Sequence, residues 1–185
     1  TRETQFERLD RVKLNKEDHK ELKNYCENSN IIFSSSPFDH KSADFLNELD
    51  VPFFKVASGE ITNLPLLKHI STFNKPILLS TGMASLGEIE EALNAMGDEH
   101  KKDIILMHCL SDYPSKWEDA NLRAIHTLKY AFHLPVGFSD HSEGIELSLV
   151  AVGMGAVIIE KHITLDRDMV GGDHKASLEP DEFNN

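Results

Sequence analysis

Short apolar runs recur along this chain and alternate with longer segments of mixed polarity. Their centres lie near residues 32, 54, 78, 105, 136 and 158. Intervals of roughly 20 to 30 residues are typical of a strand followed by a helix and two turns. The runs are apolar throughout instead of alternating with polar residues, which predicts parallel strands covered on both faces.

The segments between the runs carry helix signals. Asn15 can cap a helix, and Ser85 with Glu88 matches a capping box. We expect helices over 15–28, 42–49, from 64 onward, and over 85–96, 121–132 and 142–155. Residues 1–13 show no clear period and 166–179 contain a glycine pair, so both segments are predicted to be loops.

The first of these helices has an apolar side. Leu22, Tyr25 and Cys26 recur at helical spacing, so we expect them to face the interior. Cys26 and Cys109 are the two cysteines of the chain, and we predict reduced thiols in preference to a disulfide.

The number of units bears on the fold. Six strand–helix units are too few to close an eight-stranded barrel, although a complete open sheet of six strands would satisfy the same spacing. Because the chain starts with a helix and stops at the start of another, we favour a fragment. We therefore predict an α/β fold, a partial TIM (β/α)8-type barrel with strands 3–8, as one domain over residues 1–185.

Composition narrows the functional class. Lys and Arg number 19 and Asp and Glu 31, a net charge of −12. Such acidity argues against a nucleic-acid or membrane-surface protein, which would need a basic face. The longest apolar run, 149–159, is too short to span a bilayer, and the N-terminus does not resemble a signal peptide. We expect a cytoplasmic location.

Two histidines end neighbouring predicted strands. A strand–helix–strand unit would place His141 and His162 side by side at one end of the sheet. Neutral imidazoles there can bind manganese, zinc, cobalt or iron. The simpler interpretation is two hydrogen-bonding histidines, because two ligands are a thin coordination shell. Asp140 and Glu160 beside them can orient the rings or form ordinary salt bridges.

A lysine and a series of serines suggest an anion site. Lys55 lies within a predicted strand, where its ammonium needs an anionic partner, either a bound ligand or a structural carboxylate. Serines end five successive runs: Ser36, Ser58, Ser80, Ser111 and Ser139. One such serine is usually a cap or turn residue, but five together can surround an anion with hydroxyls and N–H groups.

Other polar residues follow the same predicted strand ends. Glu60 can act as a general acid or base, or simply stabilise the first turn of a helix. Tyr113 and Asp173 lie in the longer loops and can shape a pocket. Cys109 lacks a clear base partner, so we do not expect it to be a nucleophile.

Five motifs, in this order, resemble the N-acetylneuraminate (sialic acid) synthase family. They are Phe53–Glu60, Leu79–Met83, His108–Cys109 with Ser111, Tyr113 and Pro114, Gly137–His141, and Glu160–Asp166. The resemblance covers nearly the whole chain from Ile31 to Pro180, and the combination of motifs is highly specific.

The resemblance implies a TIM-barrel enzyme that condenses phosphoenolpyruvate with an N-acylated amino sugar such as N-acetylmannosamine. The product is a nine-carbon 2-keto acid of the sialic, legionaminic or pseudaminic type, together with phosphate. The full-length protein is expected to be a homodimer. The cofactor implied is a divalent metal, Mn²⁺ or alternatively Mg²⁺ or Co²⁺.

The resemblance also assigns roles to residues. His141 and His162 fall at the metal-ligand positions and Glu60 at a catalytic carboxylate. Tyr113 and Asp173 fall at sugar-contacting positions. The phosphoenolpyruvate-binding positions are those of Lys55, Ser36, Ser58, Ser80, Ser111 and Ser139.

The sequence departs from the family pattern in places. The family's first two strands, which carry another active-site glutamate and lysine, and its C-terminal antifreeze-like domain are not in this sequence, and Ser111 stands where some members have asparagine. We therefore expect the chain alone to be impaired or inactive.

Two alternatives are a synthase acting on sugar phosphates and a non-catalytic phosphoenolpyruvate- or metal-binding domain. The first would need a second basic site, yet only Arg123 and Arg167 follow the N-terminal segment.

Overall fold

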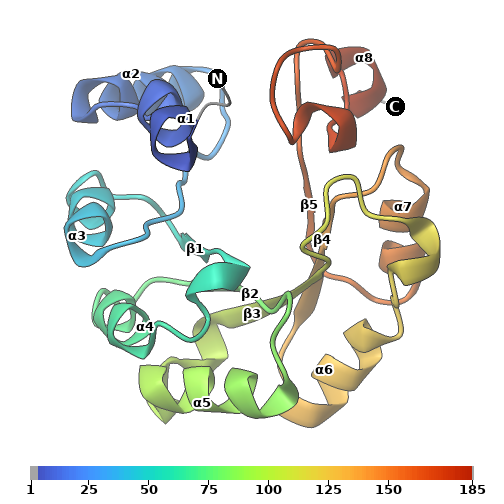
Figure 1. Ribbon diagram of the computed structural model, residues 1–185. Coiled ribbons are helices and arrows are strands. Elements are labelled where there is room, and N and C mark those ends of the chain that lie inside the picture. Colours follow the sequence, from blue (N-terminus) through green and yellow to red (C-terminus); the bar gives the residue numbers. More distant parts are fainter. Residues whose placement is uncertain (1–3, 185) are drawn as a thin grey trace.

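The computed structural model describes residues 4–184 and contains five parallel strands in one curved sheet (Figure 1). The strands are β1 (Phe54–Val56), β2 (Ile77–Ser80), β3 (Ile104–Cys109), β4 (Val136–Asp140) and β5 (Ile159–Lys161). They pair in sequence order, each parallel to the next. The predicted α/β class is confirmed, and the sheet is a curled half-barrel.

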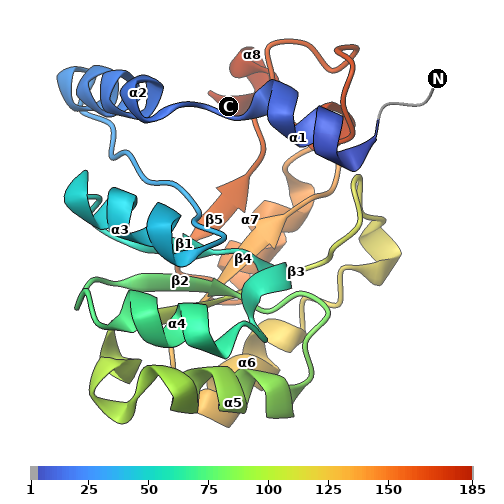
Figure 2. The ribbon, with the colours of Figure 1, turned by 60° about the vertical axis from the view of Figure 1, so that its left-hand side comes forward.

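Helices alternate with the strands and cover the convex side of the sheet (Figure 1). They are α3 (His40–Glu48), α4 (Leu64–Ser71), α5 (Leu86–Met96), α6 (Ala124–Phe132) and α7 (Glu146–Gly153). Figure 2 shows α3, α4 and α5 side by side on the outside of the sheet. Within residues 4–184, none of the helices has the length and apolar character needed to cross a membrane.

The hydrophobic core lies between the sheet and these helices. Phe54, Ile77, Leu79, Ile104 and Leu106 belong to it and are each at most 1% exposed. Apolar residues of α4, α5 and α6 complete the cluster. Burying each such large side chain contributes about 1.5–3 kcal/mol, so this outer face of the sheet supplies much of the stability.

The predicted strand over 31–33 is wrong. Residues 31–37 have no regular structure, and Ile31 and Ile32 are 61% and 71% exposed. Ser34 Oγ donates to the Phe53 carbonyl oxygen at 2.8 Å, but the segment forms no backbone ladder with β1. An apolar run becomes a strand only when a neighbouring backbone completes its hydrogen bonds. The sheet therefore has five strands where six were expected.

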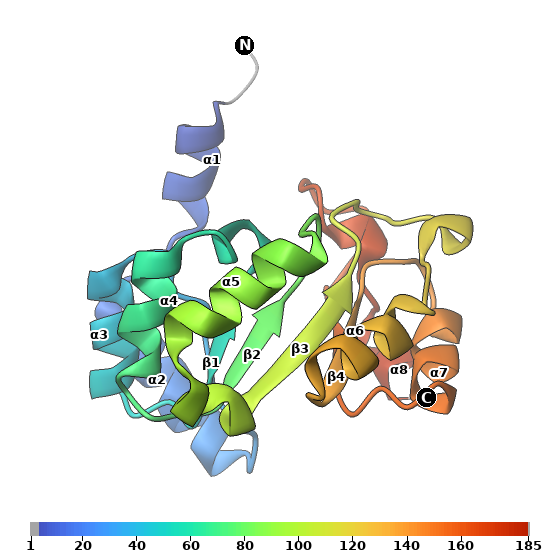
Figure 3. The same ribbon diagram turned by 90° about the horizontal axis from the view of Figure 1, so that it is seen from below.

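A helix, α1 (Gln5–Val12), replaces most of the predicted N-terminal loop. Thr4 Oγ1 accepts from the Glu7 N–H at 3.2 Å, and Glu7 Oε2 accepts from the Thr4 N–H at 2.8 Å. This reciprocal pair is a capping box, a polar signal that the pattern of apolar residues does not contain. Residues 1–3 of the predicted loop lie outside the described residues. Figure 3 shows α1 extending away from the body of the molecule.

The next helix, α2 (Lys16–Asn28), has the predicted bounds and cap but not the predicted packing. Asn15 Oδ1 accepts from two backbone N–H groups of its first turn. Leu22 and Tyr25 are nevertheless 41% and 71% exposed, and no residue of α2 is buried. The predicted inner face is wrong because the segment that follows α2 does not join the sheet, so no strand lies under the helix. Cys26 and Cys109 are free thiols, as predicted.

Two later helices begin further along the chain than predicted. A short 3-10 helix at Trp117–Asp119 precedes α6, which begins at Ala124. Gly144, with φ of 76°, lies before the start of α7 at Glu146, in a conformation that an α-helix does not contain. The predicted loop 166–179 is confirmed except for a 3-10 helix at His174–Ala176.

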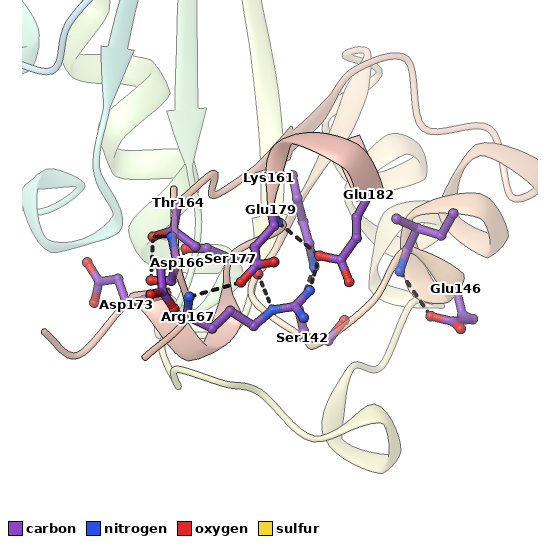
Figure 4. A network of polar contacts seen from close by, with 11 residues as sticks. Ser142, Glu146, Lys161, Thr164, Asp166, Arg167, Asp173, Ser177, Glu179 and Glu182 are labelled. Atoms are coloured by element: carbon purple, nitrogen blue, oxygen red, sulfur yellow. Dashed lines mark hydrogen bonds and ion pairs between the residues drawn. The ribbon is translucent and has the colours of Figure 1, made fainter. Parts of the chain in front are cut away.

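Arg167 ties the loop after β5 to the C-terminal helix α8 (Pro180–Phe183). Its Nε donates to the Ser177 carbonyl oxygen at 3.0 Å, and its backbone N–H donates to Glu179 Oε1 at 3.2 Å. The guanidinium group also pairs with Glu182, and this bond raises the pKa of Arg167 (Figure 4). The loop is therefore held against α8 and the residues that precede it by several contacts.

We predict that Gly137→Ala lowers the free energy of unfolding by about 1–3 kcal/mol. A Cβ at Gly137 would lie 2.5 Å from Met107 Sδ and 2.8 Å from the Ile158 carbonyl oxygen. Gly153 in α7 is the matched control, because a Cβ there meets nothing within 4 Å, so Gly153→Ala should be neutral or stabilising. Urea denaturation measures both variants, and equal free energies of unfolding would contradict the prediction.

Candidate functional site

The inner face of the curled sheet carries polar side chains. Successive residues of a strand point to opposite faces, so the neighbours of the core residues point inward. Lys55 on β1, Ser80 on β2, Cys109 on β3 and Ser139 on β4 are such residues. The register pairs Cys109 with Ser139, and Ser139 with Glu160 on β5. One face of the sheet therefore packs against the helices, and the other carries these polar side chains near the strand ends.

This surface lines a cavity of about 250 Å³ at the carboxyl ends of the strands. Most of the residues predicted for the site border it: Lys55, Ser58, Ser80, Ser111, Tyr113, Ser139, His141 and His162. Glu160, Cys109, Met83, Ala57 and Gly59 border it as well. The sequence-based expectation that strand ends would bring these residues together is confirmed for them.

An ion pair crosses the cavity between the two edge strands. Lys55 Nζ lies 3.2 Å from Glu160 Oε2, and the two side chains are 16% and 35% exposed. In a flat sheet β1 and β5 would stand roughly 19 Å apart, four strand spacings of about 4.8 Å. The pair therefore depends on the curl of the sheet. Glu160 is therefore the structural carboxylate that was one of the two partners expected for Lys55.

His141 is held in one tautomer. Its Nδ1 lies 2.5 Å from the Leu110 carbonyl oxygen, and since a carbonyl only accepts, Nδ1 carries the proton of the neutral ring. Nε2 then keeps its lone pair and lies 3.0 Å from Ser139 Oγ. Burial lowers the pKa of His141 below its ordinary value of 6.5, which favours the neutral form at pH 7. A neutral imidazole with a free nitrogen is the form that ligates metals.

His162 lies close to His141, with 5.4 Å between the ring centroids. Tyr113 stacks on His141 at 4.1 Å and meets His162 edge-on at 5.5 Å. Among residues 4–184 there is no group of three or more His, Cys, Asp or Glu side chains placed to hold an ion. The chain therefore offers two imidazoles, both bordering the cavity, as candidate metal ligands.

Glu160 connects these groups. Ser139 Oγ donates to Glu160 Oε1 at 2.6 Å and also lies beside His141 Nε2. The glutamate thus contacts Lys55 through one oxygen and Ser139 through the other. Of the two carboxylates expected to orient the rings, Glu160 bonds to Ser139, whose hydroxyl oxygen lies 3.0 Å from His141 Nε2. Asp140 contacts neither ring and lies on the outer face.

Gly82 allows three side chains to converge at the edge of the cavity. A Cβ on Gly82 would lie 2.8 Å from Ser58 Oγ and 2.9 Å from both Cys109 Sγ and Ser111 Oγ. The Gly82 N–H donates to Ser58 Oγ at 3.1 Å, and that oxygen lies 3.1 Å from Cys109 Sγ. Neither Gly82 nor Cys109 was among the residues predicted for the site. A glycine directly after a strand end was the available signal.

Ser80 has an unusual hydroxyl. Within the part of the chain that the structure describes, Ser80 Oγ is the buried side-chain polar atom that finds no hydrogen-bond partner. Ser80 is 2% exposed and borders the cavity. Because an unpaired buried hydroxyl is costly, a ligand oxygen in the cavity would satisfy it.

Tyr113 stays a phenol at neutral pH. Burial raises the pKa of Tyr113 to about 12, and the charges of Cys109, Asp173 and Glu160 add to the effect. Tyr113 can therefore donate a hydrogen bond into the cavity. Asp173 is close enough to act on this pKa, but it is exposed and does not border the cavity.

Two further predicted residues do not border the cavity. Glu60 lies in the 3-10 helix Ser58–Glu60 after β1, and its Oε2 accepts from Asn63 Nδ2 at 2.7 Å. Ser36 borders a different hollow of about 330 Å³ between α2 and α3. Ser36 lies apart from the other serines because its segment does not pair with β1.

The geometry agrees with comparisons to known proteins. The NeuB family model matches the chain over residues 1–185. The chain is 53% identical over 183 residues to N,N'-diacetyllegionaminic acid synthase of Campylobacter jejuni, covering 98% of this chain and 55% of that protein. It is 38% identical over 181 residues to N-acetylneuraminate-9-phosphate synthase of Drosophila melanogaster, covering 97% and 49%.

A solved structure gives the same result. The N-acetylneuraminic acid synthetase of Leptospira borgpetersenii, in complex with citrate, matches with a TM-score of 0.87 at 43% identity, covering 92% of this chain and 59% of that one. The chain spans about half the length of the curated relatives it matches. A family match along the whole chain, together with a solved relative of similar structure, shows that this protein belongs to the NeuB family.

Proposed function

We propose that this chain provides the barrel core of a synthase that joins phosphoenolpyruvate to an N-acylated amino sugar, such as N-acetylmannosamine or a related hexose. The products are a nine-carbon 2-keto acid and phosphate. One observation carries the proposal: an ammonium group, several serine hydroxyls and two imidazoles meet in a single cavity at the strand ends. Family membership supports it. We also propose that the whole protein is a cytoplasmic homodimer.

The donor would bind through local groups, because the chain as a whole is acidic. Phosphoenolpyruvate carries a carboxylate and a phosphate, and Lys55 is the cation bordering the cavity. Serine hydroxyls and backbone N–H groups would complete the anion site. The unpaired hydroxyl of Ser80 supports a ligand oxygen at that position. A bound phosphate would share Lys55 with Glu160.

The proposed cofactor is a divalent metal, Mn²⁺ or alternatively Mg²⁺ or Co²⁺, held by His141 and His162. The lone pair that His141 keeps on Nε2 supports this assignment. When bound, the ion would act as a Lewis acid that polarises the aldehyde oxygen of the open-chain sugar. The stacked ring of Tyr113 would hold both imidazoles in place.

The reaction makes one carbon–carbon bond, and at C2 it replaces the carbon–oxygen bond to phosphate by a carbon–oxygen bond from water. C3 of phosphoenolpyruvate attacks the aldehyde carbon, water adds at C2, and the tetrahedral intermediate collapses with loss of phosphate. Lys55 and the serine hydroxyls would hold the donor in line with the aldehyde, so positioning and electrostatics would supply much of the rate. Tyr113 would contact the sugar in the cavity. Glu60, as the proton-transferring carboxylate, and Asp173, as a second sugar contact, would act on the part of the substrate that extends beyond the cavity, which neither of them borders.

Features of the chain favour an unphosphorylated acceptor. An enzyme acting on sugar phosphates needs a second basic site. Arg167 is engaged by Glu182 and by the Ser177 carbonyl oxygen, and Arg123 does not border the cavity. The relative with the higher identity is named for a diacetylated product. Phosphoenolpyruvate carries no acetyl group, so both acetyl groups of such a product come from the acceptor. The name therefore favours an acceptor sugar with two acetamido groups, with N-acetylmannosamine as the alternative.

The reaction itself can be tested by phosphate release. We expect release that requires both phosphoenolpyruvate and the amino sugar, and that stops when a chelator removes the metal. Restoring Mn²⁺ should restore it. Given the expectation that the chain alone is impaired, the rate is expected to be low. Phosphate release without any acceptor, or with a sugar phosphate alone, would contradict the proposal.

Metal binding should depend on the two histidines. Isothermal titration of this chain with Mn²⁺ is expected to show a site that disappears in the double variant His141→Ala, His162→Ala. His126→Ala, which removes an exposed imidazole on α6, is the matched control and should bind like the parent chain. A folded double variant that keeps its Mn²⁺ affinity would show that these histidines have a structural role only.

Donor binding should depend on Ser80. We expect Ser80→Ala to weaken phosphoenolpyruvate binding about tenfold, because a hydrogen bond to a charged ligand is worth about 1.5–3 kcal/mol. Ser71→Ala is the matched control: Ser71 is also buried, but its hydroxyl donates to the Lys68 carbonyl oxygen within α4. Equal phosphoenolpyruvate affinity for the two variants would remove Ser80 from the site.

A further inference from the structure

A second polar cluster lies on the opposite face of the sheet from the cavity. Asp140 is 0% exposed, and its Oδ2 lies 3.3 Å from Lys161 Nζ, in a side chain that is 5% exposed. Asp140 Oδ1 accepts from the N–H and the hydroxyl of Ser142, at 2.9 and 2.6 Å. Ser148 on α7 donates to Oδ2 at 2.6 Å. None of these residues borders the cavity or has a part in the proposed reaction.

The position of this ion pair in the sheet is informative. Asp140 and Lys161 face each other in the register of β4 and β5. Each stands one residue before a histidine of the cavity, His141 and His162 respectively. Because side chains alternate along a strand, the ion pair lies on the outer face and the two imidazoles on the inner face. The pair therefore joins β4 to β5 at the residues that directly precede His141 and His162.

We propose that the Asp140–Lys161 pair is a positioning device for the imidazoles of His141 and His162. The inference rests on the proposed metal function and adds the residues that set the spacing of its ligands. A slip of β4 against β5 would break the ion pair and move the histidines apart. Slipping by one residue would also turn every side chain of the moved strand to the other face.

The same cluster holds the loop after His141. Lys161 Nζ donates to the Ser142 carbonyl oxygen at 2.5 Å, and Ser142 binds Asp140 through two further donors. The residue that follows His141 is thus bonded to both members of the pair. Ser148 extends the contacts to α7. His141 is consequently fixed from its own strand, from β5 and from the helix behind.

A purely structural pair and a positioning pair predict different results. A buried ion pair that loses one partner destabilises a protein wherever it lies. Positioning requires in addition that the metal affinity of the folded protein falls. Residues that orient metal ligands from outside the coordination shell typically change metal affinity by 10–100-fold.

The test compares Mn²⁺ titrations of this chain and of its Lys161→Met variant, with folding checked by circular dichroism. We expect Mn²⁺ to bind about tenfold more weakly to the folded variant. Lys75→Met is the matched control, because Lys75 pairs with Asp50 at 2.7 Å away from the cavity, and it should leave Mn²⁺ affinity unchanged. If Lys161→Met does not fold, Ser148→Ala removes one donor to Asp140, keeps the ion pair, and should weaken Mn²⁺ binding about threefold.

The outcomes separate the two proposals. A folded Lys161→Met or Ser148→Ala variant that loses thermal stability but binds Mn²⁺ like the parent chain would overturn the positioning role and leave the metal site intact. A parent chain that binds no Mn²⁺ would overturn the metal site and, with it, the role of the pair. Weaker binding in the variants, with an unchanged Lys75→Met control, supports both.

Discussion

The ion pair between Lys55 and Glu160 shows the constraint on which this structure depends: the sheet must curl. The pair joins β1 to β5, strands that are never neighbours in the hydrogen-bonded ladder. Only curvature brings the inner-face side chains of all five strands towards one point. The same curvature turns the outer face into the surface that the helices cover, so core and cavity are two consequences of one shape.

The two faces of the sheet carry different chemistry in the core and at the cavity. On the outer face, residues such as Phe54 and Leu106 are fully buried in the apolar core. On the inner face, close packing is achieved with small residues. Gly137 leaves room for Met107, and Gly82 leaves room for three polar side chains to meet. Hydrophobic burial therefore stabilises the scaffold without using the positions that line the cavity.

Charges are handled locally in this acidic chain. Lys55 lies on β1 and pairs with Glu160, and Lys161 lies on β5 and pairs with Asp140. The first pair lies in the cavity, where a ligand anion could share the lysine. The second is sealed on the far side of the sheet, where its role is to hold two strands in register.

The sequence by itself determined much of this description. Continuous apolar runs identified all five strands. Parallel strands end at one edge of the sheet, so the polar residues at their carboxyl ends were expected in one site: Ser58, Ser80, Ser139, His141 and His162. Local hydrogen bonding explains the success at Asn15 and Ser85, because a capping side chain bonds within its own turn. The family motifs are likewise readable in the chain without a fold.

Tertiary structure decided what depends on distant partners. Ile31–Phe33 has the composition of a strand, but pairing requires a second backbone, so the segment and Ser36 lie apart from the sheet. Likewise, the sequence left open whether Asp140 and Glu160 serve the histidines or form salt bridges. Which carboxylate meets Lys55 is set by the curl, and which meets Lys161 by the register between strands. Neither is a property of neighbouring residues, because both arise only when the strands assemble.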